Sequence, residues 1–198
     1  KHAIQTWKTE NQIIKRGIAC SAVKFGISFT LSHLNQAGAL VHVYSDGSIR
    51  INHGGTEMGQ GLFQKMAQVA AHEFGVSINA VKITATDTAK VPNTSATAAS
   101  SGSDLNGMAI KLACETIKTR MAESLASQYN MRPNVVIFQN NEVHIGRRVM
   151  SFGAATKACY EQRVSLSATG FYKTHKLKQQ TLMSEWMLCL YQTPTSFR

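Results

Sequence analysis

The residues with the clearest chemical potential lie between His53 and Gly61, where four glycines fall within eight positions. Glycine lets the backbone come close to a ligand. The apolar pattern of a helix begins within this segment, so the loop and the helix N-terminus can together offer main-chain N–H groups to an anionic or polar ligand. Gln60 adds a side-chain amide that both donates and accepts hydrogen bonds. The pattern fits a cofactor-binding loop, and on its own it fits a glycine-rich turn with a helix cap equally well.

A second polar loop runs from Asp87 to Ser103 and is rich in Thr, Ser, Ala and Asn. It ends in Ser101-Gly102-Ser103-Asp104, which has the spacing of a capping box and predicts a helix N-terminus. The apolar residues that follow have the spacing of one long amphipathic helix: Ile110, Ala113, Cys114, Ile117 and Met121. The chain therefore twice places a loop of small polar residues directly before a helix.

Strands must deliver the chain to the first of these loops. Alternating apolar and polar residues predict a strand over residues 21–30. Residues 39–44 and 48–52 predict two further strands joined at Asp46-Gly47, a dipeptide that favours a tight hairpin turn. This hairpin leads directly to His53.

The remaining elements complete the expected fold. Apolar spacing from Met58 predicts a helix that ends at Gly75, and residues 81–85 alternate as another strand. A second hairpin is expected from residues 135–138 and 143–145. The mixed order of strands and helices predicts an α+β fold, with mixed sheets and hairpins and two long packed helices.

Composition limits the classes of function. The net charge of +10 arises from basic residues scattered along the chain. Because no aromatic residues interleave with them, the pattern disfavours nucleic-acid binding. The sequence contains no run of about 18 apolar residues and no apolar core of a signal peptide, so we expect no membrane span and a cytoplasmic location. The four cysteines lie far apart, which predicts free thiols and no zinc site.

Five ordered segments resemble the molybdenum-binding portion of the xanthine dehydrogenase and xanthine oxidase family of molybdenum hydroxylases. They are Lys24–Thr30, Leu34–Ala39, His53–Gly61, Val91–Ser100 and Ser165–Tyr172. The resemblance implies that residues 1–174 are a partial molybdopterin-binding domain, which forms part of a larger one. Residues 175–198 do not resemble the family, and their apolar stripe fits a changed reading frame, a docking helix or a membrane-surface helix.

The resemblance implies an oxidoreductase that hydroxylates purines, from hypoxanthine to xanthine to urate, at a molybdenum–pterin centre. Iron–sulfur clusters and FAD are then expected only on other parts of the complete enzyme. The implied partners are the purine substrate and the remaining domains or subunits. The catalytic glutamate of the family belongs to a segment that this chain does not contain, so no catalytic residue is assigned and the chain alone is expected to be inactive.

The resemblance also assigns site residues. Cofactor-binding roles are implied for Met58, Gly59, Gln60, Ala98, Ala99, Ser100, Ser101, Gly102 and Ser103. Ala98 and Ala99 match small residues that leave room for a flat purine, and Ala99 is a pocket contact near molybdenum rather than a side-chain ligand. Phe29 matches an aromatic residue in edge-to-face contact with the substrate, and Thr30 a hydrogen-bonding neighbour. Glu57 and His53 are interpreted as loop residues, the latter as a hydrogen-bonding partner rather than a ligand.

Other functions stay open at this point. Aldehyde oxidases share the glycine-rich motif but tend to have glycines at the positions of Ala98 and Ala99. The charge of +10 also fits a catalytically inactive basic module that binds nucleic acid or an acidic partner. A third possibility is a chain that folds only against a partner, since it would otherwise expose a cofactor cleft.

Overall fold

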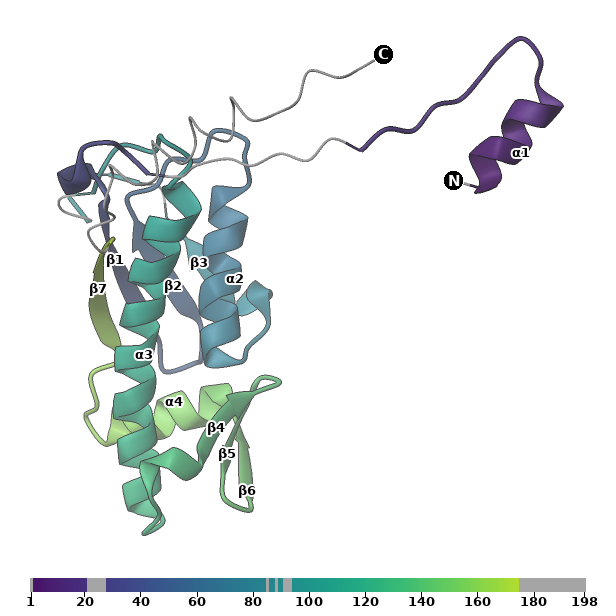
Figure 1. Ribbon diagram of the computed structural model, residues 1–198. Coiled ribbons are helices and arrows are strands. Elements are labelled where there is room, and N and C mark those ends of the chain that lie inside the picture. Colours follow the sequence, from purple (N-terminus) through teal and green to yellow (C-terminus); the bar gives the residue numbers. More distant parts are fainter. Residues whose placement is uncertain (1, 21–27, 85, 88, 91–93, 175–198) are drawn as a thin grey trace.

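The computed structural model describes residues 2–20, 28–84, 86–87, 89–90 and 94–174 (Figure 1). Most of the strand predicted over residues 21–30 and the apolar stripe beyond residue 174 therefore lie outside the described residues. Ser28, Phe29 and Thr30 are described and belong to no strand. At the N-terminal end, α1 (His2–Glu10) has no buried residue and lies apart from the rest of the molecule (Figure 1).

A four-stranded sheet forms one layer of the body, in the order β3-β2-β1-β7. Its strands are β1 (Gln36–Val43), β2 (Ile49–His53), β3 (Val81–Ile83) and β7 (Ser167–Lys173). The pairs β1–β2 and β1–β7 are antiparallel, whereas β2 and β3 are parallel. The predicted hairpin at Asp46-Gly47 is confirmed: Gly47 has φ +86°, and the Asp46 carboxylate accepts hydrogen bonds from the Ser48 N–H and hydroxyl.

Two parallel helices cover one face of this sheet, α2 (Leu62–Phe74) and the long α3 (Gly102–Gln128) (Figure 1). The apolar stripe predicted for α3 is buried against the sheet and α2, with Ile110, Ala113 and Ile117 fully inaccessible to solvent. The predicted C-terminal stop of α2 is also correct, because Gly75 takes a left-handed conformation at φ +63°. The two helices start at the same end of the molecule, next to the two polar loops.

A smaller unit at the other end of α3 consists of a three-stranded sheet and one helix. Its elements are β4 (Val136–Gln139), β5 (Glu142–Ile145), β6 (Arg148–Ser151) and α4 (Phe152–Glu161). Phe74, Phe138 and Phe152 join it to the main core, with ring centroids 5.6 and 6.5 Å apart. The β4–β5 hairpin confirms the prediction across residues 140–141, whereas β6 and α4 had not been expected.

The whole is the α+β arrangement expected, with four α-helices and two sheets among the described residues. Three short 3-10 helices complete it: Ser32–Leu34, Ile78–Ala80 and Pro133–Val135. None of the described helices is long and apolar enough to cross a membrane. Cys20, Cys114 and Cys159 are free thiols, and burial raises the pKa of Cys114 to about 12.

One helix start was predicted wrongly, and another was predicted correctly but without its cap. The helix predicted from Met58 begins only at Leu62, because residues 58–61 form the end of the loop. At the start of α3, Ser101 occupies the N-cap position, but its hydroxyl donates to the Ala98 carbonyl at 3.0 Å and makes no capping bond. The sequence spacing therefore identified the start of α3 correctly. The Ser101 hydroxyl does not cap the helix because it bonds to the turn that precedes it.

Candidate cofactor site

The two polar loops meet in a pocket of about 310 Å³ at the N-terminal ends of α2 and α3. It is lined by Met58, Gln60, Leu62, Lys65, Thr97, Ala98, Ser100, Gly102 and Ser103. Six of the nine residues expected to contact the cofactor are thus gathered around one hollow. Three lining residues were missed: Leu62, Lys65 and Thr97. Of these, Lys65 could have been found as a cation one turn inside a helix that follows a glycine-rich loop.

The other three expected contacts lie beside the pocket rather than in its lining. Gly59 is exposed with φ +96°, Ala99 is half-buried, and Ser101 is 3% exposed. Ser101 orients the loop through its bond to Ala98, so its hydroxyl does not face the pocket as a free donor. The roles of all nine residues toward a cofactor stay predictions.

The glycine-rich loop is organised by Glu57. Its carboxylate accepts hydrogen bonds from the N–H groups of Gly59, Gly61 and Phe63 at 2.9, 3.1 and 2.9 Å. These bonds lower the pKa of the carboxyl group from its usual value, and the bond from the Phe63 N–H makes the largest contribution. The Phe63 N–H in the first turn of α2 is therefore occupied from within the chain, and to that extent the expectation of outward-facing donors there was wrong. Glu57 is a loop residue, as predicted.

We expect Glu57→Gln to lower the melting temperature by several degrees at neutral pH, because a neutral amide oxygen cannot replace a carboxylate that accepts three N–H bonds. The sign of the pH effect follows from the lowered pKa: the stabilisation is complete above about pH 5 and is lost as the pH falls through the lowered value. Thermal melts between pH 7 and pH 3 measure it. Glu123→Gln, at an exposed position of α3, is the control, and equal melting temperatures of the two variants would contradict the assignment.

Gln60 folds back onto its own loop. Its Oε1 accepts from the Met58 N–H at 2.6 Å, and its Nε2 donates to the Thr56 carbonyl at 2.8 Å. The amide thus lines the pocket while holding the turn that shapes it. One oxygen lone pair and one N–H remain for a ligand, since an amide offers two of each.

The N-terminus of α3 differs from that of α2. The first-turn N–H groups of Gly102 and Ser103 have no acceptor among the residues that the structure describes. Such donors, at the positive end of the helix dipole, attract anions. With Lys65 in the same pocket, this side of the site is electropositive.

The turn before α3 is conformationally strained. Ala99 and Ser100 have φ +53° and +55°, a left-handed conformation that favours glycine. The Ala99 carbonyl accepts from the Ser28 N–H at 3.0 Å, and Ser28 itself has φ +104°. Strain of this kind gathers where the surrounding structure fixes a functional loop. The bond also brings the segment of Phe29 beside Ala99.

Phe29 is positioned by a residue that sequence reasoning missed. Asn35, only 4% exposed, accepts from the Phe29 N–H at 2.8 Å and donates to the Phe29 carbonyl at 2.9 Å. Phe29 is half-buried and Thr30 is exposed. No sequence signal identified this contact, because a single Asn in a loop is usually a turn residue.

A second buried pair of polar residues lies behind the glycine-rich loop. His53 is 1% exposed, and its Nδ1 accepts from the Gly55 N–H at 3.1 Å, which confirms its role as a loop partner. Asn106 donates through Nδ2 to the Gly102 carbonyl at 2.8 Å. The Nε2 of His53 and the Oδ1 of Asn106 have no partner among the described residues. Asn106 could have been noticed as a polar residue on the apolar stripe of α3.

The family to which these loops belong follows from sequence comparison. The family model of the molybdopterin cofactor-binding domain matches residues 1–190. The chain belongs to this family. Its cofactor is molybdopterin, and the matched residues include both loops that line the pocket.

Curated relatives are similar over most of the chain. Xanthine dehydrogenase of Dictyostelium discoideum is 49% identical over 172 residues, which are 87% of this chain and 11% of that protein. The xanthine dehydrogenase/oxidase of Gallus gallus is 46% identical over 173 residues, and nicotinate hydroxylase hnxS of Emericella nidulans is 46% identical over 187 residues. The molybdopterin-binding chain spans about a ninth of the length of these relatives.

Solved structures share the fold. CO dehydrogenase of Oligotropha carboxidovorans superposes with a TM-score of 0.64 at 19% identity, covering 70% of this chain and 18% of the other. Quinoline 2-oxidoreductase of Pseudomonas putida 86 gives a TM-score of 0.61 at 23% identity, over 70% and 19% of the two chains. The α+β fold of this chain is therefore similar to that of domains in solved molybdenum hydroxylases.

Proposed function

We propose that this chain forms one wall of the molybdopterin site of an enzyme that hydroxylates a purine. The observation that carries the proposal is the convergence of residues 58–60 and 98–103 on one pocket. The chain's similarity to several xanthine dehydrogenases, at 45–49% identity, supports the purine as substrate.

The residues of the pocket fit the cofactor in their chemistry. Molybdopterin combines a polar pterin, an anionic phosphate and the molybdenum that supplies the redox chemistry. The N–H groups of Gly102 and Ser103, which have no acceptor in the described part of the chain, suit its anionic part together with the ammonium group of Lys65. The Gln60 amide suits the mixed donors and acceptors of the pterin. Ala98 keeps the wall of the pocket free of bulk.

The substrate would be held from the neighbouring segment. Phe29 is fixed through both of its main-chain polar groups by Asn35, so its ring is carried on a constrained backbone. An aromatic ring held in this way can contact a flat heterocycle edge to face. The neighbouring Ser28 N–H bonds to the Ala99 carbonyl, and this bond would hold the substrate side of the site at a fixed position relative to the cofactor side.

Gln60→Ala tests the proposal through cofactor content rather than activity. In a complete enzyme that contains this sequence, purified from a host that makes molybdopterin, we expect molybdenum and pterin per chain to fall roughly tenfold, which corresponds to about 1.4 kcal/mol in lost hydrogen bonds. Gln64→Ala, on the exposed side of α2, is the matched control and should retain both. Unchanged content in Gln60→Ala, or a wild-type protein that never carries molybdenum, would overturn the proposal.

Nicotinate is a second candidate substrate, because the nicotinate hydroxylase of Emericella nidulans is as similar to this chain as several xanthine dehydrogenases are. Both substrates are flat nitrogen heterocycles, which suit a pocket lined by the small side chain of Ala98. Reduction of a dye by the complete enzyme with xanthine or with nicotinate separates the two. Turnover of nicotinate alone would refute the purine.

A further inference from the structure

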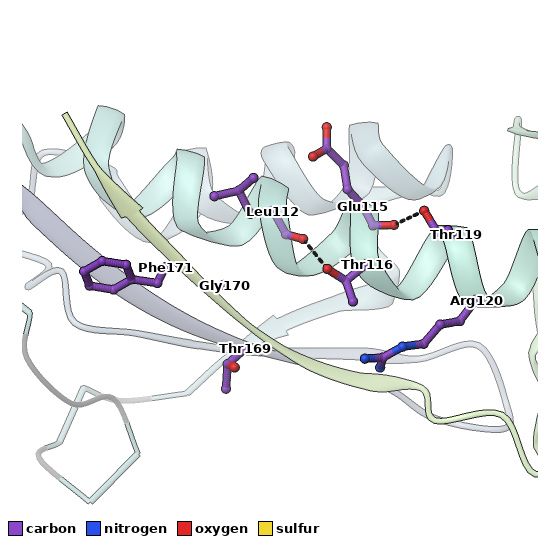
Figure 2. A pocket seen from close by; sticks show the side chains of 8 residues that line it. All are labelled: Leu112, Glu115, Thr116, Thr119, Arg120, Thr169, Gly170 and Phe171. Carbon is purple, nitrogen blue, oxygen red and sulfur yellow. Dashed lines mark hydrogen bonds between the residues drawn. The ribbon is translucent and has the colours of Figure 1, made fainter. Parts of the chain in front are cut away.

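A second hollow lies away from the cofactor pocket, between α3 and the outer edge of β7 (Figure 2). It has a volume of about 490 Å³ and is lined by Leu112, Glu115, Thr116, Thr119, Arg120, Thr169, Gly170 and Phe171. β7 is the last strand of its sheet, and among the described strands only β1 pairs with it. The hollow therefore opens along a strand edge that no other described strand pairs with.

The hydrogen bonds to β1 identify which groups of β7 face outward. The Val43 N–H donates to the Leu166 carbonyl at 2.8 Å, and the Thr174 N–H donates to the Asn35 carbonyl at 3.1 Å. Bonded and non-bonded pairs alternate along an antiparallel ladder. The main-chain groups of even-numbered residues from 166 to 174 therefore face β1. Those of Thr169, Phe171 and Lys173 point away from the sheet.

One end of this edge is already occupied. Arg120 on α3 donates through Nη1 to the Ser167 carbonyl at 3.0 Å and to the Ser165 carbonyl at 3.4 Å. These are carbonyls of the outward-facing set, which supports the assigned alternation. The free edge is thus the five residues from Thr169 to Lys173, about the usual length of a paired strand.

The wall of the hollow suits small uncharged side chains. The hydroxyls of Thr116 and Thr119 donate to their own helix, to the Leu112 and Glu115 carbonyls, both at 2.9 Å (Figure 2). The Glu115 carboxylate is paired with Lys111. The two hydroxyl groups and the carboxylate that α3 contributes to this wall are therefore paired within the chain.

The free edge lacks the usual protection against pairing. Natural sheets block exposed edges with proline, bulges or inward-pointing charges. Residues 169–173 contain no proline, and their only charge is Lys173 at the end. A second copy is a poor occupant, because each copy carries a net charge of +10 and the two would repel. The Dictyostelium relative, by contrast, is about eight times as long as this chain, since the 172 matched residues are 11% of its length.

We propose that the edge from Thr169 to Lys173 pairs with an extended strand from the rest of the molybdenum hydroxylase, and that alternate small side chains of this strand fill the hollow against α3. Main-chain bonds supply the affinity in such strand addition, and the hollow supplies the selectivity. The identity of the partner rests on the proposed function, whereas the open edge does not.

Amide hydrogen exchange tests the proposal on the full chain. In the free chain, the amides of Thr169, Phe171 and Lys173 should exchange at least tenfold faster than those of Ala168, Gly170 and Tyr172. The probe is the Dictyostelium xanthine dehydrogenase without the 172 residues that match this chain, co-expressed and captured with it. In the complex the three outward amides should slow at least tenfold. A complex in which they stay fast, or no complex, overturns the proposal.

Variants at one position separate the main chain from the side chain. Phe171→Pro removes an outward N–H and spares the bonds to β1, so capture of the probe should fall at least tenfold. Phe171→Ala removes the same ring but keeps the N–H and should retain capture. If Phe171→Pro fails to fold, Thr169→Pro removes another outward N–H. Slow outward amides in the free chain, together with a dimeric mass, would show pairing between two copies and overturn the assignment.

The readout is independent of the cofactor. Protected outward amides in a complex without molybdenum would sustain the strand pairing and contradict the proposed function. Molybdenum in a complex whose outward amides exchange fast would support the proposed function and contradict the strand pairing.

Discussion

Replacing Gly170 by alanine is expected to destabilise the fold by about 3 kcal/mol. Gly170 lies in β7 where the strand crosses α3 most closely. An added methyl group would overlap the main-chain oxygen of Ala109 and would lie 2.8 Å from the main-chain nitrogen of Ala113. Both atoms belong to the middle of a helix and cannot move without breaking its hydrogen bonds. Overpacking of this kind costs about 1–3 kcal/mol, and more where the backbone is the obstacle.

Urea unfolding followed by circular dichroism measures this loss. A protein with a stability of about 5–15 kcal/mol would lose a large share of it, and the yield of soluble protein should fall as well. Gly17→Ala is the matched control, because an added methyl group there meets no atom within 4 Å. Equal midpoints for the two variants would mean that β7 and α3 are not packed as described.

The second large effect is loss of stability in acid, arising from His53. Burial lowers the pKa of this histidine from 6.5 to about 4, so the folded protein holds it neutral. The unfolded chain binds the proton at its ordinary pKa, so protonation favours unfolding as the pH falls below about 6.5. Between pH 6.5 and pH 4 the free energy of unfolding should decrease by about 3 kcal/mol.

The contribution of His53 is isolated by a variant that does not titrate. His53→Asn keeps an acceptor for the Gly55 N–H, and its stability should lack this decrease although it starts lower. His72→Gln, on the exposed side of α2, should keep the decrease. Stability that is constant from pH 7 to pH 5 in the wild-type protein would contradict the buried neutral histidine.

Local chemistry explains which elements could be predicted. The hairpin at Asp46-Gly47 and the helix end at Gly75 depend on backbone conformations that these residues favour, so the sequence sufficed for both. The apolar face of α3 was equally clear, because its apolar residues recur at the spacing of a helix. The position of β7 beside β1 was not, because more than 120 residues separate the two strands and no local pattern orders a sheet.

The loops of the candidate site were predicted from the sequence, whereas the side-chain contacts that hold these loops in place were not. Glycine spacing and small polar residues identified the segments that converge on the pocket. Glu57 was expected to be a loop residue. Its three hydrogen bonds to main-chain N–H groups, which accompany the start of α2 at Leu62, could not be predicted because they depend on how the loop folds in space. The contact between Asn35 and Phe29 likewise joins a side chain to a backbone across a loop, a bond that leaves no periodic trace.

The left-handed backbone at Ala99 has a consequence for how sites of this family can diverge. A residue at φ +53° already has the conformation that glycine adopts without strain, and for alanine that conformation costs about 1 kcal/mol. A change from alanine to glycine at this position therefore needs no movement of the loop and relieves strain while it removes a methyl group. The turn before α3 can thus exchange alanine and glycine at this position by a single substitution, without an intermediate of lower stability.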